Sequence, residues 1–458
     1  MKRAIVDLKK ARGAILPMHC IPYSVRGGRQ RLESIRAQVG EEHYVFENNV
    51  GGGQKEIDAI REQIGEAELY ARICENAIGY GKSVDVPFLF PRFDADVNDP
   101  ASYYFPQTDY VMADAVTYAK HLIYTLGAPR EWHEPRIFCN VPSDFEKWTD
   151  VCSHIIRHYN CGLWNGFYHG IEYFEIWNEP DNPVFWNGSV EDYCRLYEAT
   201  AKTIKAIDPA LQVGGGSFAL LDETGIAFAK QFLAYVKKHC VPLDFFSYHA
   251  HDTDPNSIAY RAARVREMLA EYGCAIQVFQ TSWACVDEKA DERVRFAHLR
   301  DAQGAAYASA VMSVMQSNRV DASITSTLCT EAYGSLPYCS LLDWHGEWQK
   351  PVHALIAYHT LYALGTEAET QAYGLYVTAA TNCAGKAAIL VTHFDEDCTR
   401  GEILVKGWRD FRVTYRVLDA TRDLTPIKTE DYRNADEGAL LAAELRGYTT
   451  LLLELEQL

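Results

Sequence analysis

The spacing of apolar residues divides the chain into two regions. From about residue 14 to about residue 360, short apolar runs alternate with segments whose apolar residues recur every three or four positions. The first pattern is typical of buried strands and the second of amphipathic helices. Strand and helix repeated over this length predict a parallel sheet, and eight such repeats form a (β/α)8 TIM barrel.

Two helices are predicted most clearly, at residues 143–160 and 189–209. In the second, Ser189 and Asp192 have the spacing of a capping box, which marks a helix start. Short apolar runs around these helices predict strands at 171–177, 211–215, 243–250, 275–283 and 322–328. The first 80 residues offer only two candidate strands, at 16–24 and 43–49, and their layout is not fixed by the pattern.

The second region begins near residue 365 and has only short β-type runs divided by turn-rich segments. These runs lie at 374–382, 387–395, 401–408, 411–419 and 448–456. They predict an antiparallel β-sandwich. We therefore expect a catalytic barrel at 14–360 and an accessory β-sandwich at 361–458, which a strand from 1–13 can join.

Composition narrows the classes of partner. The formal charge of −18 argues against nucleic-acid binding, which requires a basic surface. No apolar stretch is long enough for a transmembrane helix, and the N-terminus does not have the pattern of a signal peptide. The 13 cysteines are scattered without a C-x-x-C pair, as expected for reduced thiols. We expect a cytoplasmic protein without membrane partners, whose oligomeric state the sequence does not reveal.

The string "IEYFEIWNEPD" at 171–181 carries the main candidate for chemistry. Glu179 directly follows a predicted strand, and catalytic groups of barrels lie at the carboxyl ends of strands. A lone Glu-Pro in this place is more often a solvated loop. Trp177 and Asn178 favour catalysis, because an apolar wall would raise the pKa of Glu179 and an amide would bind a sugar hydroxyl.

At this string the chain resembles glycoside hydrolase family 39, which belongs to a clan of retaining (β/α)8 glycosidases and includes β-xylosidases and α-L-iduronidases. The resemblance continues through 147–160, 175–205 and 213–217, extends to 91–109 and 341–351, and is strongest from about 90 to 220. It implies that Asn178 and Glu179 are the family's Asn-Glu pair, with Glu179 as general acid/base. It also implies a small carbohydrate substrate and no cofactor.

A retaining glycosidase needs a second carboxylate about 5 Å away as nucleophile. The family has it in a Thr-Glu-Trp-like motif on the seventh strand, and the matching stretch here is "VFQTSWAC". Ser282 stands in the place of the nucleophile, while Trp283, implied to support the sugar subsite, is kept. A serine hydroxyl cannot replace the carboxylate without an adjacent base.

Three explanations are compatible with Ser282: a chain disabled at its nucleophile, a natural sugar-binding pseudoenzyme, or another carboxylate such as Glu331 or Asp252 acting instead. A second departure concerns the Arg and the His-Asp pair that the family has on its second strand. Residues 83–96, where we expect that strand, contain neither in that place, and Arg92 follows too late to be taken as equivalent.

The segment "SYHAHDTDP" is a further candidate. By the resemblance, Tyr248 and His249 match positions that contact substrate or orient the nucleophile. Without the resemblance, His249, His251 and Asp252 allow a metal site, because residues two apart share a strand face. The further ligands of barrel metallohydrolases are not evident, and His251 is equally well read as a solvated loop residue.

The glycine stretches at 51–56 and 214–217 lack the spacing of a phosphate-binding loop and are interpreted as turns. The sequence thus predicts a protein that cleaves the terminal glycosidic bonds of small glycosides or oligosaccharides. If the nucleophile is truly absent, it binds them instead. The alternatives are a non-catalytic sugar-binding pseudoenzyme and, further off, a metal-dependent barrel hydrolase using His249 and His251.

Overall fold

The computed structural model describes residues 2–21, 54–65, 69–73, 84–116, 119–129, 131, 135–220, 222–287, 290, 291, 294, 297–326, 341 and 348–458. The predicted strand at 43–49 and the candidate Glu331 lie outside the described residues.

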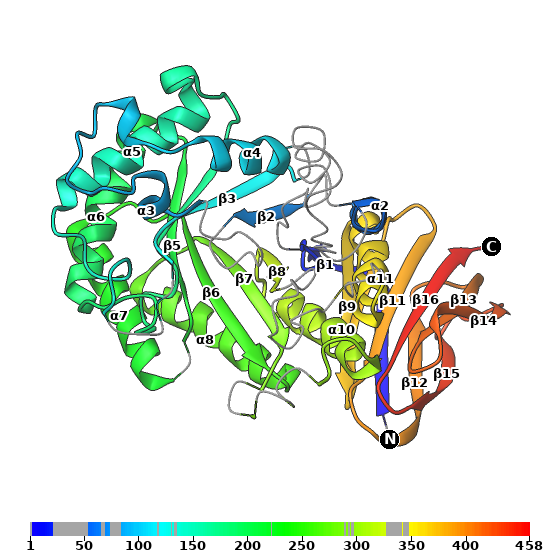
Figure 1. Ribbon diagram of the computed structural model, residues 1–458. Coiled ribbons are helices and arrows are strands. Elements are labelled where there is room, and N and C mark those ends of the chain that lie inside the picture. The colour runs from blue at the N-terminus through cyan, green and yellow to red at the C-terminus, as the bar shows by residue number, and fades with distance from the viewer. Residues whose placement is uncertain are drawn as a thin grey trace.

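A parallel sheet forms the first region and curls into a nearly closed barrel (Figure 1). Its strands follow chain order: β2 (Tyr70–Ile73), β3 (His121–Leu126), β4 (Tyr173–Ile176), β5 (Gln212–Phe218), β6 (Phe245–Asp252), β7 (Gln277–Cys285) and β8 (Ala322–Thr325). Residues 17–20 lie beside β8, where the Cys20 N–H donates to the Ser323 carbonyl at 3.2 Å and the Thr325 N–H donates to the Cys20 carbonyl at 3.1 Å. The chain therefore enters the barrel near residue 17, within the predicted strand at 16–24.

Helices surround the strands, as the 3.6-residue periodicity predicts (Figure 1). They are α2 (Gln54–Gln63), α3 (Val86–Leu89), α4 (Pro106–Ala115), α5 (Phe145–Cys161), α6 (Val190–Ile207), α7 (Glu223–His239), α8 (Pro255–Tyr272), α10 (Ala302–Ser317) and α11 (Lys350–Leu364). The capping box of α6 is confirmed, because the Asp192 N–H donates to Ser189 Oγ and the Ser189 N–H donates to Asp192 Oδ2, both at 3.1 Å.

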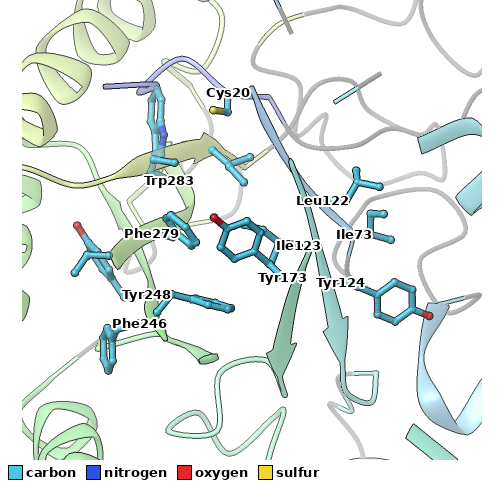
Figure 2. Packing of buried hydrophobic residues seen from close by; sticks show 14 of the residues in the cluster. Cys20, Ile73, Leu122, Ile123, Tyr124, Tyr173, Phe246, Tyr248, Phe279 and Trp283 are labelled. Atoms are coloured by element: carbon cyan, nitrogen blue, oxygen red, sulfur yellow. The ribbon is translucent and has the colours of Figure 1, made fainter. Parts of the chain in front are cut away.

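An aromatic layer fills the lower part of the barrel. Tyr173 of β4 lies 5.4 Å from Phe279 of β7, measured between ring centroids, and Figure 2 shows the two rings close together. Tyr70 and Phe245 complete the layer at 5.3 Å from Phe279. Side chains from different strands thus meet inside the barrel. They form a packed layer below the polar groups at the carboxyl ends of the strands.

The second region is one curled, mostly antiparallel sheet of nine strands. It contains β1 (Lys2–Ala14), β9 (Thr366–Tyr373), β10 (Tyr376–Thr381), β11 (Lys386–His393), β12 (Cys398–Lys406), β13 (Phe411–Leu418), β14 (Asp423–Tyr432), β15 (Ala439–Arg446) and β16 (Thr449–Gln457). One face encloses its own apolar core, while Leu390 and Leu452 on the other face belong to the core of the barrel. Helices α10 and α11 lie between barrel and sheet (Figure 1). The domain limits at 360 and 361 stay a prediction.

Two expectations need correction. Residues 84–96 do not form the second strand: that strand is β2 at Tyr70–Ile73, and helix α3 occupies part of 84–96. Residues 214–217 are not a turn but lie inside β5. A Cβ at Gly216 would come within 2.4 Å of the Tyr193 hydroxyl and 2.9 Å of Pro180, so glycine is required there by close packing.

Two further properties concern the described residues. None of the helices described here is both long and apolar enough to cross a membrane. The cysteines within the described ranges are free thiols, so no disulfide constrains that part of the fold.

Candidate active site

Glu179 lies just beyond the carboxyl end of β4, in a turn with unusual backbone geometry. Trp177 and Glu179 have φ angles of 68° and 46°, in the left-handed region that side-chain-bearing residues seldom adopt. Two backbone hydrogen bonds hold this turn, from Trp177 N–H to the Leu126 carbonyl at 2.9 Å and from Glu179 N–H to the Gly216 carbonyl at 2.8 Å. Neighbouring strands therefore fix the direction of the Glu179 side chain.

The Glu179 carboxylate is held by two partners and is only 9% exposed. Oε1 lies 2.6 Å from Nδ1 of His249 on β6, and Oε2 accepts from Nδ2 of Asn182 at 2.8 Å. Burial raises the pKa of Glu179, but the hydrogen bond and charge of His249, with the hydrogen bond from Asn182, outweigh it and hold that pKa below its ordinary value. Glu179 is therefore a carboxylate at neutral pH.

This direction corrects the expectation that an apolar wall from Trp177 raises the pKa of Glu179. The Trp177 Nε1–H donates to the Phe185 carbonyl at 2.8 Å, and its ring packs against Trp148 of α5. The group that sets the charge of Glu179 comes instead from β6.

His249 complements the carboxylate because burial lowers its own pKa. At neutral pH the imidazole is uncharged, with Nδ1–H donating to Glu179 and Nε2 left as an acceptor. Nε2 is buried and has no hydrogen-bond partner among the described residues. The pair thus offers two acceptors, a carboxylate and an imidazole nitrogen, of the kind that bind hydroxyl groups.

Ser282 lies on β7, where it is the register partner of His249 on the adjacent strand. Neighbouring strands lie about 4.8 Å apart, so His249 links Ser282 to Glu179 at one end of the barrel. Ser282 Oγ itself lies 3.0 Å from Nε2 of His251. The sequence left His251 open between a metal ligand and a solvated loop residue, and the structure places it on β6 beside the serine.

Beneath Glu179 lies a buried ion pair that sequence reasoning missed. Arg72 of β2 donates to Oε2 of Glu175 from Nη2 at 2.6 Å and from Nε at 2.8 Å. Its Nη2 also donates to Oδ1 of Asn178 at 2.7 Å and to Oγ of Ser217 at 2.6 Å. Burial raises the pKa of Glu175. The charge of Arg72 and the hydrogen bonds from hydroxyl groups lower it by a larger amount, so Glu175 and Arg72 are both charged.

Arg72 is an arginine on the observed second barrel strand, β2. The family resemblance places an arginine on that strand, and β2 carries Arg72 in the run "LYARIC". A single cation inside an otherwise apolar strand was the signal that could have found it. Arg92, by contrast, lies outside any strand, between α3 and α4.

The other predicted site residues are buried away from this cluster. Tyr248 is fully buried, with its hydroxyl 3.4 Å from Gln280 Oε1, on the opposite face of β6 from His249. Trp283 is also buried, and its ring lies 6.3 Å from that of Tyr307 of α10. Their roles in substrate binding stay predictions.

Asp252 and a metal site gain no support here. Oδ2 of Asp252 accepts from Ser257 Oγ at 2.6 Å, and Oδ1 accepts from the N–H of Thr253 at 2.8 Å, so the carboxylate is engaged at the start of α8. Across the described part of the chain, no group of three or more His, Cys, Asp or Glu side chains is arranged to hold a metal ion.

Comparison with known proteins links this geometry to a family. The profile described as "Glycosyl hydrolases family 39" matches residues 125–289. A curated relative, the "Beta-xylosidase" of Geobacillus stearothermophilus, is 38% identical over 120 residues, which are 24% of this chain and 21% of the relative. The match thus spans about a fifth of the relative's length. The resemblance to glycoside hydrolase family 39 is confirmed over this segment, which includes Glu179, His249 and Ser282.

Solved structures extend the likeness to the whole fold. A glucosidase from Croceicoccus marinus has a TM-score of 0.71 at 19% identity and covers 100% of this chain and 99% of its own. A monomeric beta-xylosidase from Caulobacter crescentus CB15 has a TM-score of 0.71 at 18% identity, with 100% of both chains covered. The predicted fold class, a TIM barrel with a C-terminal β-sandwich, is confirmed.

Proposed function

We propose that this chain recognises the terminal sugar of small glycosides or oligosaccharides, because a segment of its barrel matches glycoside hydrolase family 39. Glu179 would occupy the acid/base position and Ser282 the nucleophile position. One observation carries the proposal: the carboxylate of Glu179 lies 2.6 Å from His249, which is the strand partner of Ser282. The two positions that the mechanism requires are thus linked by one residue.

The same geometry favours binding over hydrolysis by the retaining mechanism. That mechanism needs a protonated acid and a second carboxylate about 5 Å away. A second carboxylate would also raise the pKa of the first by like-charge repulsion. With Ser282 in its place, Glu179 has a lowered pKa and cannot readily donate a proton at neutral pH. We therefore propose a glycosidase-like protein that binds sugars without retaining turnover.

Calorimetric titration with methyl xyloside and related small glycosides tests the binding. Xylosides are the first choice because two similar proteins are named beta-xylosidases. We expect saturable binding by the unmodified chain and no release of nitrophenol from aryl glycosides. The absence of binding to any small glycoside would contradict the proposal.

The variant Ser282→Glu separates the explanations for the missing nucleophile. Turnover of an aryl glycoside by this variant, abolished by adding Glu179→Gln, would show that the site lacks only its nucleophile. No turnover would support a pseudoenzyme. Hydrolysis by the unmodified chain that survives Ser282→Ala would instead require another carboxylate, for which Glu331 is the candidate to replace next.

A further inference from the structure

The end of β7 carries a pair of side chains that retaining glycosidases do not need. Ser282 Oγ and His251 Nε2 are 3.0 Å apart, a distance within the range for a nucleophile and its base. Both come from strands: His251 lies on β6, two residues after His249, and Ser282 on β7. A parallel sheet, rather than a loop, therefore holds their separation.

We propose that Ser282 and His251 form a nucleophile–base pair that removes an acyl group from an O-acylated sugar. This inference rests on the proposed function for the sugar, which the Glu179 half of the site would hold. Attack by serine at an anomeric carbon would end in a stable alkyl glycoside, because a serine alkoxide is a poor leaving group. Attack at an ester carbonyl gives a new ester, which water can hydrolyse with the same base.

The step balances with water as the second reactant. Ser282 Oγ bonds to the carbonyl carbon while its proton passes to His251 Nε2, and the bond from that carbon to the sugar oxygen then breaks. The sugar oxygen takes the proton from His251, which releases a free hydroxyl and leaves an acyl-serine ester. Water attacks this ester, giving its proton to His251, and Ser282 Oγ leaves and regains that proton as the carboxylic acid departs.

The neighbouring groups suit a polyhydroxylated substrate. Glu179 is a carboxylate with a pKa below its ordinary value, and His249 Nε2 is a buried nitrogen without a partner among the described residues. Both accept hydrogen bonds from hydroxyl groups. Because His249 is the register partner of Ser282, a sugar bound to it would lie next to the serine.

A fluorophosphonate probe tests the nucleophile directly. We expect the probe to label Ser282 in the folded chain, detected by intact mass and peptide mapping, and His251→Gln to slow labelling by about 100-fold or more. Ser153, whose Oγ accepts a hydrogen bond from Arg157 on the same helix, is the matched control: it should stay unlabelled, and Ser153→Ala should label normally. Failure to label Ser282, or labelling that His251→Gln leaves unchanged, would overturn the proposal.

Two more measurements keep the test decisive. In Ser282→Cys, iodoacetamide should alkylate the thiol faster than in Ser282→Cys/His251→Gln, and equal rates would count against the pair. The unmodified chain should hydrolyse 4-nitrophenyl acetate and acetylated methyl xyloside, and Ser282→Ala should not. Sugar binding by Ser282→Ala is measured separately, so binding without labelling refutes only this inference, and labelling without binding refutes only the proposed function.

Discussion

The ends of β4 and β7 hold two acid–base pairs that differ in chemistry. At β4, Glu179 meets His249, and below these two residues lies a buried ion pair of Arg72 with Glu175. At β7, a neutral serine meets His251. In the function we propose, the β4 half supplies the acid/base position of a glycosidase, and the β7 half has a hydroxyl at the nucleophile position. Charge stabilisation is therefore concentrated in one half of the site, and nucleophile activation in the other.

The largest effect should come from the ion pair beneath the β4 half. Arg72→Leu leaves Glu175, which is fully buried, without its cation. We expect a loss of about 3–5 kcal/mol in the free energy of unfolding, because a buried charge without a partner is strongly destabilising. Urea unfolding measures this loss, and Arg72→Leu/Glu175→Leu should recover much of it. A loss below about 1 kcal/mol would mean that Glu175 takes up a proton at little cost.

The next largest effect should be on sugar affinity, which we expect to fall more in a variant of the β4 half than in a variant of the β7 half. Glu179→Gln removes a charged acceptor, worth about 1.5–3 kcal/mol or roughly a 10- to 100-fold loss of affinity. Ser282→Ala removes a neutral hydroxyl and should cost at most about 10-fold. Calorimetry on both variants with one glycoside gives the comparison. A larger loss for Ser282→Ala would reverse our assignment of the binding half.

Acid should weaken the β4 half. The pKa of His249 is below its ordinary 6.5, so on acidification the unfolded chain takes up a proton that the folded chain refuses. The pKa of Glu179 is below its ordinary 4.5, so the stability it contributes is lost as pH falls through the folded value. Each proton costs about 1.4 kcal/mol per pH unit. Urea unfolding of His249→Asn from pH 7 to 5 should show a shallower decline than the unmodified chain, and parallel declines would contradict this.

The smallest effect should come from Asp181, next to the β4 half. Burial raises its pKa from 3.8 to about 7, and the charge of Glu179 also raises it, although the N–H groups of Ala219 and Leu220 lower it. A raised pKa means that stability from the neutral form is lost as pH rises through about 7. Asp181→Asn should remove about 1 kcal/mol of this decline between pH 6 and 7, measured by thermal unfolding. An unchanged profile would show that Asp181 is ionised throughout.

Much of the fold was predictable because local signals agreed with tertiary packing. The 3.6-residue pattern of α5 and the capping box of α6 were both in the sequence. Strands β14 and β15, the two outer strands of their sheet, were missed for different reasons. β14 consists mostly of polar residues and lacks the apolar run by which buried strands are recognised. β15 is built from Ala, Leu and Glu, which are residues typical of helices.

The site was predictable only where one string carried it. Glu179 follows from "EIWNEP", but its partner His249 is 70 residues away, and the lowered pKa depends on a contact that only the barrel creates. The pairing of His251 with Ser282 depends equally on the register of β6 and β7, which shifts between Tyr248 and His249. Periodicity gives the face on which a side chain lies, and register gives the side chain it meets.

The groups that hold Glu179 in place do not include residue 282, so residue 282 can be replaced independently. His249, Asn182 and the Gly216 carbonyl hold Glu179, and none of them belongs to β7. Evolution or protein design can therefore exchange the side chain at residue 282 among carboxylate, hydroxyl and thiol, while the side of the site that carries Glu179 keeps its shape. New chemistry can be tried at residue 282 by single substitutions, while the proposed sugar site around Glu179 stays unchanged.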